Sequence, residues 1–278
     1  MKIAFYDDGS GPRTGIVTAE RLTPTGLAGG MAELIAAWDD VQAELRRREA
    51  AGDGAPLASV RLLPPVPRPG KVFAIGLNYA DHIAESKMET PQHQVWFTKA
   101  VTSVNGPFDP VQIPRISQTV DYEAELVAVI GKGGKHIGRD DAAARIFGYC
   151  VGNDVTERMW QHRTAQWSLG KSFDTHAPIG PWITTSDEID PHNLALKCLV
   201  NGEERQSSNT RHLVFDVFDQ VAHLSQAMTL EPGDLVFTGT PGGIGAAMTP
   251  RRFLKPGDVV RCEIEGLGHI ENRFEPEA

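Results

Sequence analysis

Long apolar runs, long blocks of basic residues and closely spaced cysteines are all missing from this 278-residue chain. No stretch approaches the roughly 20 apolar residues that a membrane-spanning helix needs. The N-terminal stretch MKIAFYDDGS becomes acidic too early to hold the apolar segment of a signal peptide. The net charge is −9, from 27 basic and 36 acidic residues, so neither nucleic acid nor an anionic membrane is an expected partner.

Cysteine is scarce as well. The chain has an odd number of cysteines, three: Cys150, Cys198 and Cys262. They lie far apart in the sequence, and each has apolar neighbours. This pattern favours buried free thiols over a disulfide framework or a metal site. Free thiols are typical of a reducing compartment. Together with the missing signal peptide, they predict a cytoplasmic protein.

The spacing of apolar residues predicts a small N-terminal α/β domain followed by a larger one. Residues 1–20 have the pattern of a hairpin, and apolar residues recur at helical spacing over about 30–50. The proline-rich stretch at 62–70 suits the interior of neither a helix nor a strand. It therefore divides a domain over 1–65 from one over 66–278.

The larger domain is expected to be mainly β. After residue 71, short β-like runs alternate with Gly and Pro turns, and two Pro-Gly-Asp turns each introduce a strand. Helical patterns are fewer, and they cover 79–86, 140–147, 156–165 and 214–227. Many strands with few helices favour a rolled β architecture, and hence an α+β, mainly β fold, over a doubly wound sheet.

The stretch VDYEAELVAVIG, residues 120–131, places like charges at the start of an apolar strand. Because strand side chains alternate between faces, Glu123 and Glu125 point the same way. Adjacent carboxylates repel each other and are costly to bury. Two interpretations remain open: an edge strand with its carboxylates in water, or a hard divalent cation held by carboxylate oxygens. The metal site would need a further carboxylate from elsewhere.

Asp154 is the candidate for that carboxylate. It follows a strand-like stretch and precedes a predicted helix that Thr156 could cap. The alternative is that Asp154 caps the helix itself. Arg158 and Gln161 lie three apart on one face of this helix, which suits a carboxylate ligand. For Arg158 the alternative is a solvated surface charge.

Three further patterns carry polar groups suited to catalysis. In AIGLNYADHIAES, His82 and Glu85 lie three apart, so the carboxylate can orient the imidazole as a general base toward water; a surface pair is the alternative. In SLGKSFDTHAPIG, Lys171 could offer a cation to a carboxylate or enolate, although a lone lysine is usually on the surface. In VFTGTPGGIGA, backbone N–H groups and the Thr240 hydroxyl could meet an anion, or the turn is simply a tight loop. Residues 203–212 are polar and suit a loop near the site or at a dimer interface.

Taken in order, these stretches closely resemble the fumarylacetoacetate hydrolase superfamily, from about Lys71 to about Glu271. The resemblance is carried by IGLNYADHIAES, FTKAVTSVNGPFDPV, VDYEAELVAVIG, GNDVTERMWQ, GKSFDTHAPIGPW, VNGEERQ, LEPGDLVFTGTPGGIG and LKPGDVVRCEIEGLG. Each piece alone is weak, but the ordered set is highly specific. It favours the metal site over the edge strand.

The resemblance implies a mixed β-roll catalytic domain, a small N-terminal domain and usually a homodimer. It implies that a divalent ion, Mg²⁺, Mn²⁺ or alternatively Ca²⁺, is held by Glu123, Glu125 and Asp154. It implies catalytic roles for His82, Glu85 and Lys171, and substrate contacts for Arg158, Gln161 and Thr240. The segment around Ser86–Gln94 corresponds to a mobile lid. Leu77 stands where some acylpyruvase-like members carry Arg, which makes a substrate with a second carboxylate less expected.

The implied activity is hydrolysis of a C–C bond in a small 2,4-diketo acid, such as an acylpyruvate or fumarylpyruvate. His82, oriented by Glu85, would deprotonate the attacking water, and the metal would hold the pyruvate-like enolate that leaves. The alternative is a decarboxylase, lyase or isomerase acting on a 2-keto acid at the same metal site, because the sequence does not show water attack. A non-enzymatic metal-binding scaffold is a third hypothesis, which the joint presence of His82, Glu85 and Lys171 disfavours.

Overall fold

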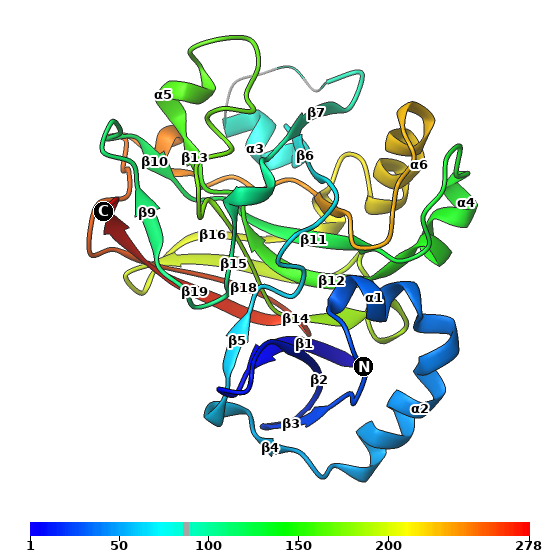
Figure 1. The fold of residues 1–278 in the computed structure, drawn as a ribbon. Coiled ribbons are helices and arrows are strands. Elements are labelled where there is room, and N and C mark those ends of the chain that lie inside the picture. Colours follow the sequence, from blue (N-terminus) through cyan, green and yellow to red (C-terminus); the bar gives the residue numbers. More distant parts are fainter. Residues whose placement is uncertain (86–88, 90) are drawn as a thin grey trace.

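The computed structural model describes residues 1–85, 89 and 91–278, and a large rolled sheet dominates it (Figure 1). Within these residues, twelve strands share that sheet. Ten of them follow one another in the order β4 (Ala55–Pro56), β3 (Arg21–Pro24), β2 (Arg13–Thr18), β1 (Lys2–Asp7), β14 (Ala177–Thr185), β12 (Ile146–Asn153), β11 (Ala124–Ile130), β17 (Leu235–Phe237), β6 (Val72–Gly76) and β7 (Val95–Thr98). Off this path, β5 (Arg61–Leu63) pairs with β1, and β8 (Val104–Asn105) pairs with β14.

A second sheet packs against the first. In the described part of the chain it contains β16 (Glu203–Asn209), β15 (Ala195–Val200), β18 (Val259–Ile264), β19 (Gly268–Pro276) and β9 (Val111–Ile113), in that order. A two-stranded ribbon joins β10 (Val120–Asp121) to β13 (Thr156–Glu157). Leu126 of β11 and Leu196 of β15 belong to one buried cluster, which therefore fills the space between the two sheets. The expected mainly β fold with mixed sheets is confirmed, since β17 pairs parallel with β6 in an otherwise largely antiparallel sheet.

Six α-helices lie around these sheets among the described residues: α1 (Met31–Ala36), α2 (Trp38–Ala51), α3 (Ala80–Glu85), α4 (Arg139–Ala142), α5 (Arg158–Gln161) and α6 (Val217–Ala227). The single helix expected over 30–50 is interrupted at Ala37. The helix expected over 140–147 is shorter, because Ile146 and Phe147 begin β12 and are buried in the sheet. None of these helices is long and apolar enough to cross a membrane.

The helix expected over 156–165 is also wrong in extent, since α5 makes a single turn. Thr156 does not cap it: Thr156 pairs with Asp121 in the ribbon, and Glu157 caps the helix by accepting a hydrogen bond from Trp160 N at 2.6 Å. Asp154 is not the cap either. The carboxylate of Asp154 therefore makes no capping hydrogen bond to α5.

Strand β11 is buried on both of its faces. Leu126 and Ala128 point into the cluster between the sheets, whereas Val127 and Val129 join a second cluster that also contains Leu34 of α1. This explains why the sequence shows a continuous apolar run here instead of alternation. It also means that the carboxylates at the start of this strand enter the protein interior.

The first 65 residues continue the main sheet. Strands β1 and β2 form the predicted hairpin, and β1 also pairs with β14. The division between 1–65 and 66–278 stays a prediction. The three cysteines are buried and free, as expected.

Candidate metal and catalytic site

Three carboxylates meet where β11 begins and β12 ends. These strands are antiparallel, with Glu125 opposite Gly152, so the start of one lies beside the end of the other. Asp154 N donates to the carbonyl oxygen of Glu123 at 2.9 Å. One oxygen from each of Glu123, Glu125 and Asp154 lies within 4.8 Å of the others, and all three side chains are buried. The fold therefore unites the three residues that the sequence pointed to.

Buried cations face two of these carboxylates. Lys171 Nζ lies 2.8 Å from Glu123 Oε2 and 2.6 Å from Asp154 Oδ2. Lys99 Nζ lies 2.5 Å from Asp154 Oδ1. Burial opposes the charge of Lys171, but Asp154 and Glu123 outweigh it and hold the pKa of Lys171 above its ordinary value. Lys171 is thus a buried cation and not a surface lysine.

Glu125 has no such counter-charge among the described residues. Its carboxylate accepts a hydrogen bond from Gly239 N at 2.7 Å. Burial, followed by the nearby charges of Asp154 and Glu123, raises the pKa of Glu125 well above its usual range. The three carboxylates are buried, and one of them has no cation beside it. Such a set of oxygen ligands fits Mg²⁺ or Mn²⁺, since both ions prefer oxygen ligands.

Arg158 is also buried, at 6% exposure, so a solvated surface charge is excluded. Its Nη1 lies 2.7 Å from Glu123 Oε1 and donates to Gln161 Oε1 at 3.0 Å. Its Nε donates to Asp121 Oδ2 at 2.9 Å. Asp121 itself accepts from the N–H groups of Gly245 and Ala246 in the glycine-rich turn. The glycine-rich turn therefore binds an anion of the protein itself, the carboxylate of Asp121.

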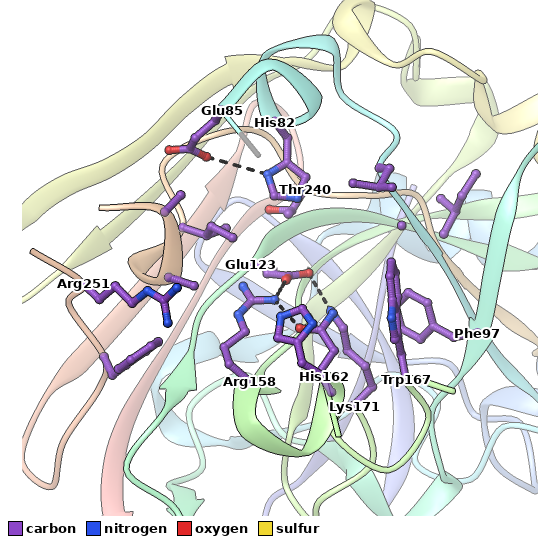
Figure 2. Close-up of a pocket in the computed structure, with 18 residues that line it drawn as sticks. His82, Glu85, Phe97, Glu123, Arg158, His162, Trp167, Lys171, Thr240 and Arg251 are labelled. Carbon is purple, nitrogen blue, oxygen red and sulfur yellow. Dashed lines mark hydrogen bonds and ion pairs between the residues drawn. The ribbon is translucent and has the colours of Figure 1, made fainter. Parts of the chain in front are cut away.

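His82 and Glu85 lie on α3, across the cavity from Glu123 (Figure 2). His82 Nδ1 is 3.7 Å from Glu85 Oε2, which is longer than a hydrogen bond but close enough for an interaction of charges. Gly243 N donates to both Glu85 oxygens, at 3.0 and 3.1 Å, and so fixes the carboxylate. The pair therefore faces the cavity, with His82 largely buried and Glu85 partly exposed.

Several of these groups line one cavity of about 370 Å³. It is lined by Ile75, Gly76, Leu77, His82, Glu85, Phe97, Glu123, Arg158, Gln161, His162, Trp167, Lys171, Thr240, Ile244, Ala246, Ala247, Arg251 and Phe253. Figure 2 shows aromatic side chains, Phe97 and Trp167, on one side of Lys171 and a cation, Arg251, on the other. The two aromatic rings and Arg251 thus lie on opposite sides of the cavity.

Thr240 and Gln206 lock the glycine-rich turn onto β11. Thr240 Oγ1 donates to the carbonyl oxygen of Ala124 at 3.0 Å and accepts from Gln206 Nε2 at 2.8 Å. Gln206 Oε1 also accepts from Ala124 N at 2.9 Å. The loop expected over 203–212 is wrong for most of its length, because β16 runs from Glu203 to Asn209 and pairs with β15.

Sequence reasoning missed Lys99 and Gln206, and did not assign His162 and Arg251. Lys99 stands in the stretch FTKAVTS, and Gln206 in VNGEERQ, but a lone polar residue near a strand gives no local signal of its role. The lid expected around Ser86–Gln94 lies partly outside the described residues, at 86–88 and 90. It stays a prediction.

The sequence matches one family model over residues 71–275, and this model is described as fumarylacetoacetate (FAA) hydrolase C-terminal. Among curated relatives, an oxaloacetate tautomerase named Fahd2a, from Rattus norvegicus, is 50% identical over 220 residues, which cover 78% of this chain and 70% of the relative. An oxaloacetate tautomerase named FAHD2A, from Bos taurus, is 43% identical over 268 residues, covering 95% and 85% respectively.

Two solved structures are similar over their full length. A maleylpyruvate hydrolase from Sphingobium sp. SYK-6, in complex with manganese(II) and pyruvate, has a TM-score of 0.86 and 32% identity. A 5-carboxymethyl-2-hydroxymuconate delta-isomerase from Mycobacterium smegmatis has a TM-score of 0.82 and 33% identity. Each comparison covers 100% of both chains. Hydrolases and isomerases therefore share this architecture.

The expected cytoplasmic location is contradicted by the relatives. The rat, human and cattle tautomerases are all named as mitochondrial proteins. The expectation depended on free cysteines and on an N-terminus without a long apolar segment. Neither feature separates the cytoplasm from the interior of an organelle that keeps thiols reduced.

Proposed function

This chain belongs to the fumarylacetoacetate hydrolase family, and from that premise we propose that it is a divalent-metal-dependent enzyme that interconverts the keto and enol forms of a 2-keto acid such as oxaloacetate. The relatives named as oxaloacetate tautomerases support this activity above C–C bond hydrolysis. The observation that carries the proposal is the buried trio of Glu123, Glu125 and Asp154, which lies beside a cavity that also contains His82 and Lys171.

The metal would be held by the three carboxylates of this trio. Bound there, Mg²⁺ or Mn²⁺ would act as a Lewis acid and stabilise the negative charge that develops on the 2-oxygen. Lys171 and Arg158 keep the carboxylate of Glu123 ionised, because their charges outweigh the burial that opposes it and hold its pKa below the usual range. Both cations line the cavity, where Lys171 and Arg158 bind the 1-carboxylate end of the substrate, whereas the hydroxyl of Thr240 is already engaged with Ala124 and Gln206.

His82 moves the proton. Keto–enol interconversion transfers one proton between C3 and the 2-oxygen. With Nδ1 of His82 turned toward Glu85, the Nε2 atom takes the proton from C3, and the electron pair of that C–H bond forms the C2–C3 double bond. The imidazolium then gives the proton to the 2-oxygen. Glu85 stabilises the charged ring in between.

Proton NMR of oxaloacetate in D₂O tests this activity. The metal-loaded protein should speed the exchange of the C3 protons for deuterium above the rate with metal alone, without consuming the acid. Release of CO₂ and pyruvate in step with the enzyme concentration would instead assign a decarboxylase. If the C3 protons exchange no faster than with metal alone, the proposal of a tautomerase is wrong.

Hydrolysis of a 2,4-diketo acid is the second candidate. The specific observation in its favour is that His82 and Glu85 face the cavity together and could activate a water. The similar structure named as a maleylpyruvate hydrolase also supports it. Pyruvate and a second acid, formed from an acylpyruvate or fumarylpyruvate, would identify this reaction. The homodimer implied by the family resemblance stays a prediction.

A further inference from the structure

Among the described residues, the charged side chains that line the cavity have protein partners with one exception, Arg251. Arg158 pairs with Asp121 and Glu123, Lys171 pairs with Glu123 and Asp154, and Glu85 faces His82. Arg251 also lines the cavity, but within residues 1–85, 89 and 91–278 no carboxylate lies at ion-pair distance from it. A cation left unmatched beside a substrate cavity suits an anionic group of the ligand.

The loop that carries Arg251 is fixed to the rest of the site. Arg252 N donates to the carbonyl oxygen of Gly245 at 3.0 Å. Gly245 N in turn donates to Asp121 Oδ1 at 2.8 Å, and Asp121 holds Arg158. The side chain of Arg252 is directed elsewhere, since it forms two hydrogen bonds with Glu203, at 2.8 and 3.0 Å. Two adjacent arginines thus have different surroundings, and only Arg251 is among the residues that line the cavity.

The charge at this end of the cavity belongs to Arg251 and not to His162. His162 also lines the cavity. Its burial, together with the charges of Arg158, Arg251 and Lys171, lowers the pKa of His162 below its ordinary value of 6.5. The imidazole is therefore neutral at neutral pH. Figure 2 shows Arg251 on the opposite side of Arg158 from Trp167 and Phe97.

We propose that Arg251 binds the distal carboxylate of the substrate, and so selects 2-keto dicarboxylic acids over 2-keto acids with an uncharged tail. This inference rests on the proposed function, because it places the 1-carboxylate at Lys171 and Arg158. An anionic tail then meets Arg251, whereas an apolar tail would turn toward Phe97 and Trp167. Some acylpyruvase-like members carry an arginine at the position of Leu77. In this chain Arg251 supplies a cation to the cavity instead, from a different part of the fold.

The test compares Arg251→Gln with Arg252→Gln, which removes the same charge one residue further along. Calorimetry on Mg²⁺-loaded protein measures the dissociation constants of malate and lactate, two stable 2-hydroxy acids that differ by the distal carboxylate. In the wild-type protein malate should bind at least about 10-fold more tightly than lactate. Arg251→Gln should abolish that preference by weakening malate alone, and Arg252→Gln should keep it.

Turnover gives a second measurement. The ratio of kcat/KM for oxaloacetate to that for phenylpyruvate should fall about 10-fold in Arg251→Gln and stay unchanged in Arg252→Gln. Equal effects of the two variants, or an unchanged malate preference in Arg251→Gln, would overturn the inference, as would a wild-type protein that does not prefer malate. If neither keto acid is turned over while the calorimetric preference depends on Arg251, the proposed reaction fails but the carboxylate subsite stands.

Discussion

Lys99 Nζ lies 2.5 Å from Asp154 Oδ1, and both side chains are completely buried. The other oxygen of Asp154 faces Lys171 at 2.6 Å. Lys99 also donates to the carbonyl oxygen of Lys171, so one ammonium connects the end of β12 to the loop that carries the second lysine. Asp154 is therefore held between two lysine side chains, which fix its position beside Glu123 and Glu125.

Replacing Lys99 with Met should destabilise the protein strongly. Breaking a buried ion pair by removing one partner leaves the other charge poorly compensated, which costs about 3–5 kcal/mol. We expect a loss of about 3 kcal/mol in the free energy of unfolding, at the low end because Lys171 still faces Asp154. Urea unfolding of metal-free protein measures it.

The matched control is Lys132→Met. Lys132 and Asp39 form an ion pair at 2.6 Å, but their side chains are 57% and 61% exposed. An exposed pair contributes less than about 1 kcal/mol. Equal losses in the two variants would show that Lys99 has no special part in holding the site.

Glu125→Gln should separate metal binding from folding. The amide keeps the size of the side chain and cannot ionise in this buried position, so the metal-free variant should be at least as stable as the wild-type protein. The dissociation constant for Mn²⁺ should rise by more than about 10-fold, as measured by calorimetry. The exposed Glu204→Gln serves as control, and wild-type affinity in Glu125→Gln would argue against the carboxylate trio as the metal site.

His82→Asn should lower kcat and leave metal binding unchanged. A positioned general acid–base group contributes about 10²–10⁴-fold to the rate, so a loss of at least about 100-fold in kcat is expected. Glu85→Gln should have a smaller effect, since Glu85 acts through His82. His212→Asn, at an exposed position, should match the wild-type protein. A His82→Asn variant with full turnover would assign the proton transfer to another group.

The sequence predicted the residues of this site better than the contacts between them. The apolar run in β11 and the shared direction of Glu123 and Glu125 follow from strand geometry alone. Asp154 was a candidate because it follows a strand-like stretch, but only the ordered set of motifs favoured it as a ligand, because no spacing rule links it to β11. Lys99 and Gln206 were not predicted, since each is a single polar residue whose partners lie far away in the sequence.

Helix lengths were the least predictable feature. Alanine at position 37 is a good helix former, and no residue type there marks the break between α1 and α2. At α5 the cap is Glu157, one residue after the expected Thr156, because pairing of Thr156 with Asp121 extends the ribbon. Tertiary pairing decided both the start and the length of this helix.

His176 should make the protein sensitive to acid. Full burial lowers the pKa of His176 to about 3, helped by Lys99 and opposed by its hydrogen bond with the carbonyl oxygen of Gln112. The unfolded chain takes up this proton near pH 6.5 and the folded chain does not, so stability falls as pH drops from about 6.5 toward 3, by up to about 1.4 kcal/mol per pH unit.

The test follows the free energy of unfolding from pH 7 to pH 4.5. His176→Gln should show a shallower fall than the wild-type protein, because the amide can still donate to Gln112 and does not titrate. His212→Gln, at an exposed position, should keep the wild-type slope. Parallel profiles for all three proteins would show that His176 is not responsible for the acid sensitivity.

The most direct test of metal-dependent tautomerisation is the rate at which enol-oxaloacetate converts to the keto form, followed by ultraviolet absorbance. The protein is stripped of metal and then supplied with Mg²⁺ or Mn²⁺. We expect no acceleration without metal, acceleration above the metal-only rate once the ion is restored, and loss of that gain in Glu125→Gln. A chelated protein that is as active as the metal-loaded one, or a loaded protein that leaves the rate of metal alone unchanged, would contradict the account.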